Sequence, residues 1–159
     1  MAVEPGTPDD VLIRPPRLME LRDLGELCLR SKAVHGYSAA MLSAMHTELL
    51  ISGEELARDS LAVAECAGTA IGVVQVTVDE EGCHLEKLFI EPHWIGHGVG
   101  ARLLDWAMAE ARARGAEEML IDADPGAAAF YESRGAKRVG EVPSGSIPGR
   151  CLPRLVLPL

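Results

Sequence analysis

Apolar residues recur at helical spacing in several stretches of the chain. Leucines three or four positions apart predict a helix over residues 18–31, and a stripe of methionine and leucine predicts a second helix that Ser38 caps. A third, shorter helix is expected around residues 54–58. Another apolar stripe begins at residue 99 and predicts a long helix that stops at Gly115, because glycine commonly terminates helices.

The middle of the chain has the composition and spacing of β-strands. Residues 61–67 and 70–78 are rich in valine and alanine and are separated by Gly68-Thr69, which predicts a β-hairpin. Residues 83–90 would form the third strand of this antiparallel meander. Strict alternation along the third strand predicts two faces: Leu85, Lys87 and Phe89 on one, and His84, Glu86, Leu88 and Ile90 on the other.

The remaining strands are short and lie towards the two ends of the chain. Residues 11–14 predict an edge strand that Pro15 stops, because proline lacks the N–H group that a sheet ladder needs. Residues 118–121 predict a buried strand, and residues 137–142 and 152–157 predict the final strands.

A short helix is expected between the strands at residues 118–121 and 137–142. Asp124-Pro125 has the pattern of an N-cap residue followed by proline at the first helical position, and this helix would carry Tyr131. The order of helices and strands predicts an α/β (α+β) fold. We expect a single mixed, mostly antiparallel, twisted sheet of about six to seven strands, flanked by about four helices.

Length and charge limit the possible partners. With 159 residues the chain has the size of one domain, which we place at residues 11–159, after a flexible N-terminal arm at residues 1–10. Its 15 basic and 24 acidic residues give a net charge of −9, which argues against broad binding to nucleic acid or to an anionic membrane. The sequence has no secretory signal, membrane-spanning stretch, disulfide framework or metal-ligand cluster. We therefore expect a cytoplasmic protein without a bound metal.

Glycines alternate at positions 96, 98 and 100, directly before the long helix. Glycine lets a ligand approach the backbone closely, and the first N–H groups of a helix have no partner within the helix. Such N–H groups bind phosphate or pyrophosphate, which predicts an anion site here despite the negative net charge. A Walker loop is disfavoured because Ala101-Arg102 follows in place of Lys-Ser/Thr, and a dinucleotide site because the spacing is GxGxG.

In its surroundings this loop resembles the coenzyme A pyrophosphate loop of the GCN5-related N-acetyltransferase (GNAT) family. The resemblance covers nearly the whole chain and is densest at residues 88–92, 96–101 and 124–132. It implies a GNAT-like sheet that splays between its fourth and fifth strands, with acetyl-CoA bound in the splay. The cofactor-binding residues that it implies are Leu88, Phe89, Ile90, Ile95, Gly96, His97, Gly98, Val99, Gly100, Ala101, Asp124 and Ala127.

The resemblance also implies the reaction and the residues that carry it. The acceptor amine would attack the thioester directly, with Glu86, or as second choice His84, as the base. Tyr131 would be the acid that protonates the departing CoA thiolate. These residue types also fit plainer roles: a solvated strand position for Glu86, and core packing for Tyr131.

The candidate substrate-binding residues lie in two loops. His35 and Tyr37 follow the first helix, and Arg150 ends a Pro/Gly/Ser-rich loop before the last strand. The leading interpretation is an acetyltransferase acting on a primary amine of a small molecule, as a monomer or homodimer. Acetylation of a protein N-terminus or lysine is one alternative, and an acyl-CoA-binding sensor without catalysis is another. The sensor is favoured by Ile95, where the family usually has Arg or Gln, and by Asp124, where it often has Asn.

Overall fold

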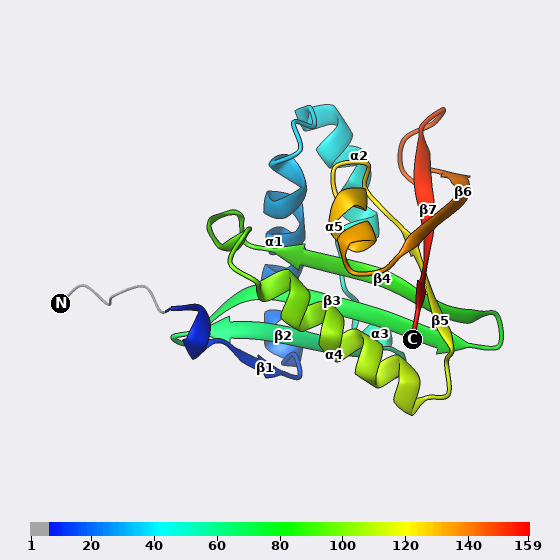
Figure 1. Ribbon diagram of the computed structural model, residues 1–159. Helices are drawn as coiled ribbons and strands as arrows, with labels where there is room; N and C mark the ends of the chain where they lie inside the picture. Colours follow the sequence, from blue (N-terminus) through cyan, green and yellow to red (C-terminus); the bar gives the residue numbers. More distant parts are fainter. Residues whose placement is uncertain (1–6) are drawn as a thin grey trace.

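A seven-stranded sheet forms the centre of the protein (Figure 1). The computed structural model describes residues 7–159. The strands are β1 (Leu12–Arg14), β2 (Ser60–Cys66), β3 (Thr69–Asp79), β4 (Gly82–Ile90), β5 (Glu118–Asp122), β6 (Lys137–Pro143) and β7 (Cys151–Pro158). They lie in the order β1-β2-β3-β4-β5-β7-β6, and only β4 and β5 are parallel neighbours. The mixed, mostly antiparallel sheet expected from the sequence is therefore confirmed.

The helices begin and end close to where the apolar stripes place them. They are α1 (Leu21–Ala33), α2 (Ala39–Leu49), α3 (Gly53–Arg58), α4 (Val99–Ala113) and α5 (Ala128–Ser133), with 3-10 turns at Pro8–Asp10, Leu18–Glu20 and Pro92–Trp94. The predicted cap at Ser38 is confirmed, because its hydroxyl accepts a hydrogen bond from the Met41 N–H at 3.2 Å. Most of the expected N-terminal arm, residues 1–6, lies outside the described residues.

Helices cover both faces of the sheet, with α4 on one face and α1 on the other (Figure 1). Leu103 and Leu104 of α4 are fully buried on the first face. Leu24 and Leu27 of α1 pack with Met45 of α2 on the second. Full burial of one such side chain is worth about 1.5–3 kcal/mol, so these two layers hold the helices to the sheet. Within residues 7–159 no helix combines the length and the apolar composition needed to cross a membrane.

The sheet splays between β4 and β5, as the family resemblance implies. A single residue pair, His84 with Leu120, joins these two parallel strands. Beyond it β4 continues to Ile90 without a partner on this side, whereas on its other side it pairs with β3 along its whole length. The outer edge of β4 therefore leaves backbone groups that a ligand can pair with.

A β-bulge at Glu86 reverses the alternation along β4, and the predicted division of its faces is therefore wrong. Leu85 pairs with Val76 and Lys87 with Gln75, so Glu86 is an extra residue in the ladder. An extra residue shifts the later side chains to the opposite faces.

The two faces of β4 consequently have a different membership from the expected one. His84, Glu86, Lys87 and Phe89 lie on the α1 face, and Leu85, Leu88 and Ile90 on the α4 face. His84 and Glu86 still share a face, as expected. Lys87 joins them, which strict alternation did not allow.

The start of α5 also differs from the expectation. The helix begins at Ala128 rather than at Asp124-Pro125. The Asp124 carboxylate accepts a hydrogen bond from the Gly126 N–H at 3.1 Å, and its backbone carbonyl accepts one from the Ala127 N–H at 2.8 Å. Aspartate thus stabilises a tight turn here in place of a helix cap, because its carboxylate reaches a nearby N–H in either conformation.

Candidate active site

The glycine loop forms an open cradle of backbone N–H groups at the start of α4. Gly98 is the N-cap residue with φ +82°, and Gly96 has φ +85°, a conformation that other residues rarely adopt. The loop is exposed from Gly96 to Gly98. Of the N–H groups at residues 96–101, only that of His97 has an acceptor among the described residues, the Trp94 carbonyl at 3.3 Å. The others are free to bind an anion.

A cleft of about 490 Å³ lies where β4 and β5 separate. It is bordered by α1 and α2 on one side, by β5 and α5 on another, and by the ends of β6 and β7. The sequence-predicted residues that line it are His35, His84, Glu86, Leu88, Phe89, Asp124, Ala127 and Tyr131.

The other predicted residues lie around this cleft rather than in its lining. Ile90 is buried, and its N–H donates to the Ser31 hydroxyl at 3.4 Å. The segment from Ile95 to Ala101 lies at the start of α4, where the Ile95 side chain is exposed. Tyr37 and Arg150 reach the cleft through the Asp124 carboxylate.

Tyr131 presents a hydroxyl to the cleft. Its side chain is buried beside the Phe130 ring, with 5.2 Å between the ring centroids. None of the described residues hydrogen-bonds this hydroxyl. Every fully buried side-chain oxygen among the described residues has a hydrogen-bond partner, so the Tyr131 hydroxyl is not fully buried and is accessible from the cleft. Burial, reinforced by the charge of Asp124, raises the pKa of Tyr131 well above its usual value. The phenol therefore stays protonated at neutral pH and can donate a proton or hydrogen bond.

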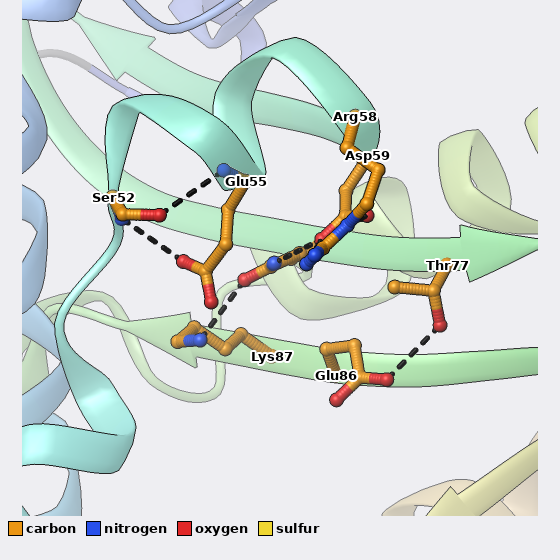
Figure 2. Close-up of polar contacts among 8 residues, drawn as sticks. Ser52, Glu55, Arg58, Asp59, Thr77, Glu86 and Lys87 are labelled. Carbon is orange, nitrogen blue, oxygen red and sulfur yellow. Dashed lines mark hydrogen bonds and ion pairs between the residues drawn. The ribbon is translucent and has the colours of Figure 1, made fainter.

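Glu86 and His84 lie beside each other on the face of β4 that contains the cleft. The Thr77 hydroxyl donates to Glu86 Oε1 at 3.0 Å, a contact drawn in Figure 2. Glu86 and His84 also line a second cavity of about 470 Å³. A carboxylate held on one oxygen by a hydroxyl retains its second oxygen for a water or an amine, which is what a general base requires.

Asp124 lies at the centre of a cluster of four polar side chains, and the other three are Lys32, Tyr37 and Arg150. Tyr37 donates to the Asp124 carboxylate, and Arg150 donates to the Tyr37 hydroxyl. The ammonium of Lys32 lies 3.6 Å, and the guanidinium of Arg150 3.7 Å, from the same carboxylate oxygen. The structure thus brings together Tyr37 and Arg150, two of the residues predicted to bind the acceptor, and it adds Lys32.

The charges in this cluster shift the ionisation of its members. Burial alone would raise the pKa of Asp124, but the hydrogen bonds from Tyr37 and the Gly126 N–H, with the nearby charge of Lys32, outweigh it and lower that pKa. Burial raises the pKa of Tyr37, and the hydrogen bond to Asp124 raises it further. At neutral pH Asp124 is therefore a carboxylate and Tyr37 a neutral phenol.

Lys87 is a further polar residue of the cleft, and sequence reasoning assigned it no role. It is only 7% exposed and donates to Gln75 Oε1 at 3.0 Å. The sequence nevertheless contained a hint of this role, since Lys87 lies between the apolar Leu85 and Phe89 on the predicted face of the strand. A lysine inside such a set is unusual, because lysine is almost never fully buried unless it is paired.

The central part of the chain matches a known family in sequence. The acetyltransferase (GNAT) domain family matches residues 57–135, which run from α3 to just beyond α5. The chain belongs to the GNAT family. The matched segment includes β4, the glycine loop and Tyr131. No curated protein matches the chain significantly in sequence.

Solved GNAT structures have the same fold at low sequence identity. A GCN5-related N-acetyltransferase from Rhodopseudomonas palustris is 21% identical, with a TM-score of 0.78 over 100% of both chains. PaiA N-acetyltransferase from Thermoplasma acidophilum, solved with coenzyme A, is 19% identical, with a TM-score of 0.77 over 94% of this chain and 99% of that one. A ribosomal-protein alanine N-acetyltransferase from Escherichia coli is 18% identical, with a TM-score of 0.67 over 93% of each chain. The GNAT-like fold expected from the resemblance is confirmed.

Proposed function

We propose that this GNAT protein transfers an acetyl group from acetyl-CoA to a primary amine of a small molecule. The observation that carries the proposal is the cradle of free N–H groups at the start of α4, next to the splay of β4 and β5. Such a cradle suits a diphosphate, and the cleft beyond it contains an acid and a base, Tyr131 and Glu86. The coenzyme A bound to the PaiA N-acetyltransferase supports the same cofactor class.

The backbone supplies most of the cofactor's affinity in this proposal. The dipole of α4 contributes about 0.3–1 kcal/mol per charge, whereas each hydrogen bond to a charged group is worth about 1.5–3 kcal/mol. Several N–H groups acting together at residues 98–101 therefore hold the diphosphate without a basic surface. The pantetheine arm pairs with the open edge of β4 at Leu88, as an added strand would.

Glu86 assists the attacking amine. A free alkyl ammonium has a pKa of about 10.4, so removing its proton at pH 7 costs about 4–5 kcal/mol. Glu86, held by Thr77 on one oxygen, takes this proton directly or through a water molecule, which accelerates such steps by about 10²–10⁴-fold. His84 lies on the same face and can share the proton.

Tyr131 completes the transfer by protonating the leaving group. The amine nitrogen forms a bond to the carbonyl carbon and releases its surplus proton to water, and the carbon–sulfur bond breaks. The Tyr131 proton passes to the CoA thiolate, and the phenolate regains a proton from water. Burial keeps the phenol protonated at neutral pH, so that it donates a hydrogen bond to the sulfur as negative charge develops there. No covalent acyl-enzyme is needed, which agrees with the fact that no cysteine lines the cleft among the described residues.

The rim of the cleft supports a small acceptor. The cluster of Lys32, Tyr37, Asp124 and Arg150 joins the α1–α2 link to the loop before β7. The cleft has a volume of about 490 Å³, which is the size of a small-molecule site, and the hydrogen bonds and ion pairs of this cluster connect the two loops at its rim. A protein chain would need a more open groove past this cluster.

The test combines acetyl-CoA binding with thiol release. We expect calorimetry to detect acetyl-CoA binding, and a panel of small primary amines to release free thiol and yield acetylated product by mass spectrometry. Absence of binding would overturn the cofactor assignment. Binding without thiol release by any amine or peptide would indicate the acyl-CoA sensor, and release only with peptides would indicate a protein acceptor.

A further inference from the structure

Lys87 is a buried cation of the cleft that the proposed mechanism does not use. Its side chain is 7% exposed, lines the cleft, and forms no ion pair with any carboxylate of the described residues. Its described side-chain partner is the neutral Gln75, at 3.0 Å. An ammonium group has three N–H donors, so it has hydrogen-bonding capacity left for a ligand.

The carboxylate that accepts a hydrogen bond from Gln75 is already paired with an arginine. Gln75 donates to Asp59 Oδ2 at 2.7 Å, and Arg58 binds both oxygens of Asp59, at 2.8 and 3.2 Å (Figure 2). Burial alone would raise the pKa of Asp59, but these hydrogen bonds outweigh it and lower that pKa. Asp59 therefore stays ionised and orients Gln75, which in turn accepts the hydrogen bond from the Lys87 ammonium. Asp59 itself forms no ion pair with Lys87.

The bulge in β4 places this cation next to an anion. Glu86 and Lys87 are consecutive residues whose side chains lie on one face of β4, and each has its own neutral partner (Figure 2). Neither neutralises the other by an ion pair in the described structure. A pair of neighbouring opposite charges held apart in this way is complementary to a ligand that carries both an ammonium and a carboxylate.

We propose that Lys87 forms a carboxylate subsite and that the acceptor is an amino acid or a similar amino-carboxylate. The acceptor's amine faces Glu86, and its carboxylate binds the Lys87 ammonium. The subsite rests on the proposed acetyltransferase function, because it names the substrate class of the same cleft. It also accounts for the burial of a lysine that forms no direct ion pair with a described carboxylate, although Glu48, Glu86, Asp122 and Asp124 line the same cleft.

The test compares each amino acid with its amide, which lacks the negative charge of the carboxylate. The acceptors are glycine, β-alanine, γ-aminobutyrate and L-α-amino acids with larger side chains, so that several amine–carboxylate spacings are covered. An α-amino acid amide has the less basic amine, so intrinsic reactivity favours the amide. We expect the wild-type kcat/KM to be higher for at least one acid than for its amide by about 10- to 100-fold, the range of a charge-assisted hydrogen bond.

Variants at Lys87 separate recognition from other roles. Lys87→Met keeps the length and apolar stem but removes the charge, and we expect it to abolish the preference for the acid through KM while acylation of the amides continues. Lys137→Met removes a cation from an exposed position of β6 and is the matched control. Lys87→Arg retains the charge and should keep part of the preference, which covers the case in which Lys87→Met folds poorly.

Product binding provides a readout that does not depend on turnover. Calorimetry should show that N-acetyl amino acids bind the wild type more tightly than their amides, and that Lys87→Met removes the difference. Equal kcat/KM for acids and amides, or an equal loss for both in Lys87→Met, would overturn the subsite while leaving the acetyltransferase intact. If no amine causes thiol release, the result would instead contradict the proposed acetyltransferase function.

Discussion

Replacing Gly98 by alanine tests whether the start of α4 is a ligand site or only a helix end. Gly98 is the N-cap residue of α4 and has φ +82°, and a Cβ added there meets no protein atom within 4 Å. Gly115, just beyond the other end of α4, has φ +86° and equally open surroundings. The two glycines are therefore matched in backbone conformation and in space, but only Gly98 lies in the cradle.

The expected loss of stability is the same at both positions. A residue with a Cβ in the left-handed conformation costs about 1–2 kcal/mol, and neither site adds a steric clash. For a domain of this size about 1 kcal/mol lowers Tm by roughly 2–4 °C, so each variant should melt a few degrees below the wild type. The two melting temperatures should agree with each other.

The expected loss of cofactor affinity differs between the two variants. A methyl group at Gly98 occupies the open space in front of the free N–H groups and would keep a diphosphate from one of them. One hydrogen bond to a charged group is worth about 1.5–3 kcal/mol, so acetyl-CoA should bind Gly98→Ala about 10- to 100-fold more weakly. Gly115→Ala should bind it as the wild type does.

Calorimetric titration with acetyl-CoA measures this difference, and a thermal melt of each apoprotein controls for folding. A second titration with desulfo-CoA would show whether the loss concerns the diphosphate rather than the thioester. Equal affinities of Gly98→Ala and Gly115→Ala for acetyl-CoA would refute the role of the cradle, whatever their stabilities.

Three further predictions concern the cleft. Tyr131→Phe should lower kcat by about 10²-fold or more without changing the Kd of acetyl-CoA, and unchanged turnover would remove Tyr131 from the mechanism. Because burial raises the pKa of Tyr131, ionisation of this group should cause no loss of wild-type activity below about pH 10. Tyr37→Phe and Arg150→Met should each weaken acceptor binding but not acetyl-CoA binding. Because Arg150 donates to the Tyr37 hydroxyl, a double-mutant cycle should give a coupling energy of about 0.5–3 kcal/mol, and additive effects would contradict the shared cluster. Asp124→Asn should be about 1–2 kcal/mol less stable than the wild type at pH 7. The folded-state pKa of Asp124 is lowered, so its stabilisation is present above about pH 4 and is lost at lower pH, and a stability gap that stays constant down to pH 3 would contradict this.

Much of the fold is determined by local patterns that act over one or two turns of chain. The apolar stripes of α1, α2 and α4 and the valine-rich runs of β2 and β3 place these elements within a few residues of their observed bounds. The glycines before α4 mark the open N–H groups for the same reason, because the requirement for φ above zero at Gly96 and Gly98 is local. The resemblance to the GNAT family adds the splay between the fourth and fifth strands.

The details that the sequence did not reveal all depend on pairing between distant segments. The bulge at Glu86 arises in the register between β4 and β3, and no local spacing signals it. The turn at Asp124 is also joined by a distant residue, because Tyr37, which lies 87 residues earlier in the chain, donates to its carboxylate. The partner of Lys87 is likewise on another strand, Gln75 of β3.

The amino-acid sequence by itself determined the helices and strands and the glycine loop with its open N–H groups, because periodicity, helix ends and glycine conformations are set by near neighbours in the chain. The tertiary structure alone decided which polar side chains lie close together. It joined Tyr37 and Arg150 across 113 residues and put Glu86 and Lys87 on one face of β4. Contacts of this kind depend on strand register and on the packing of loops, where one extra residue reverses a whole face.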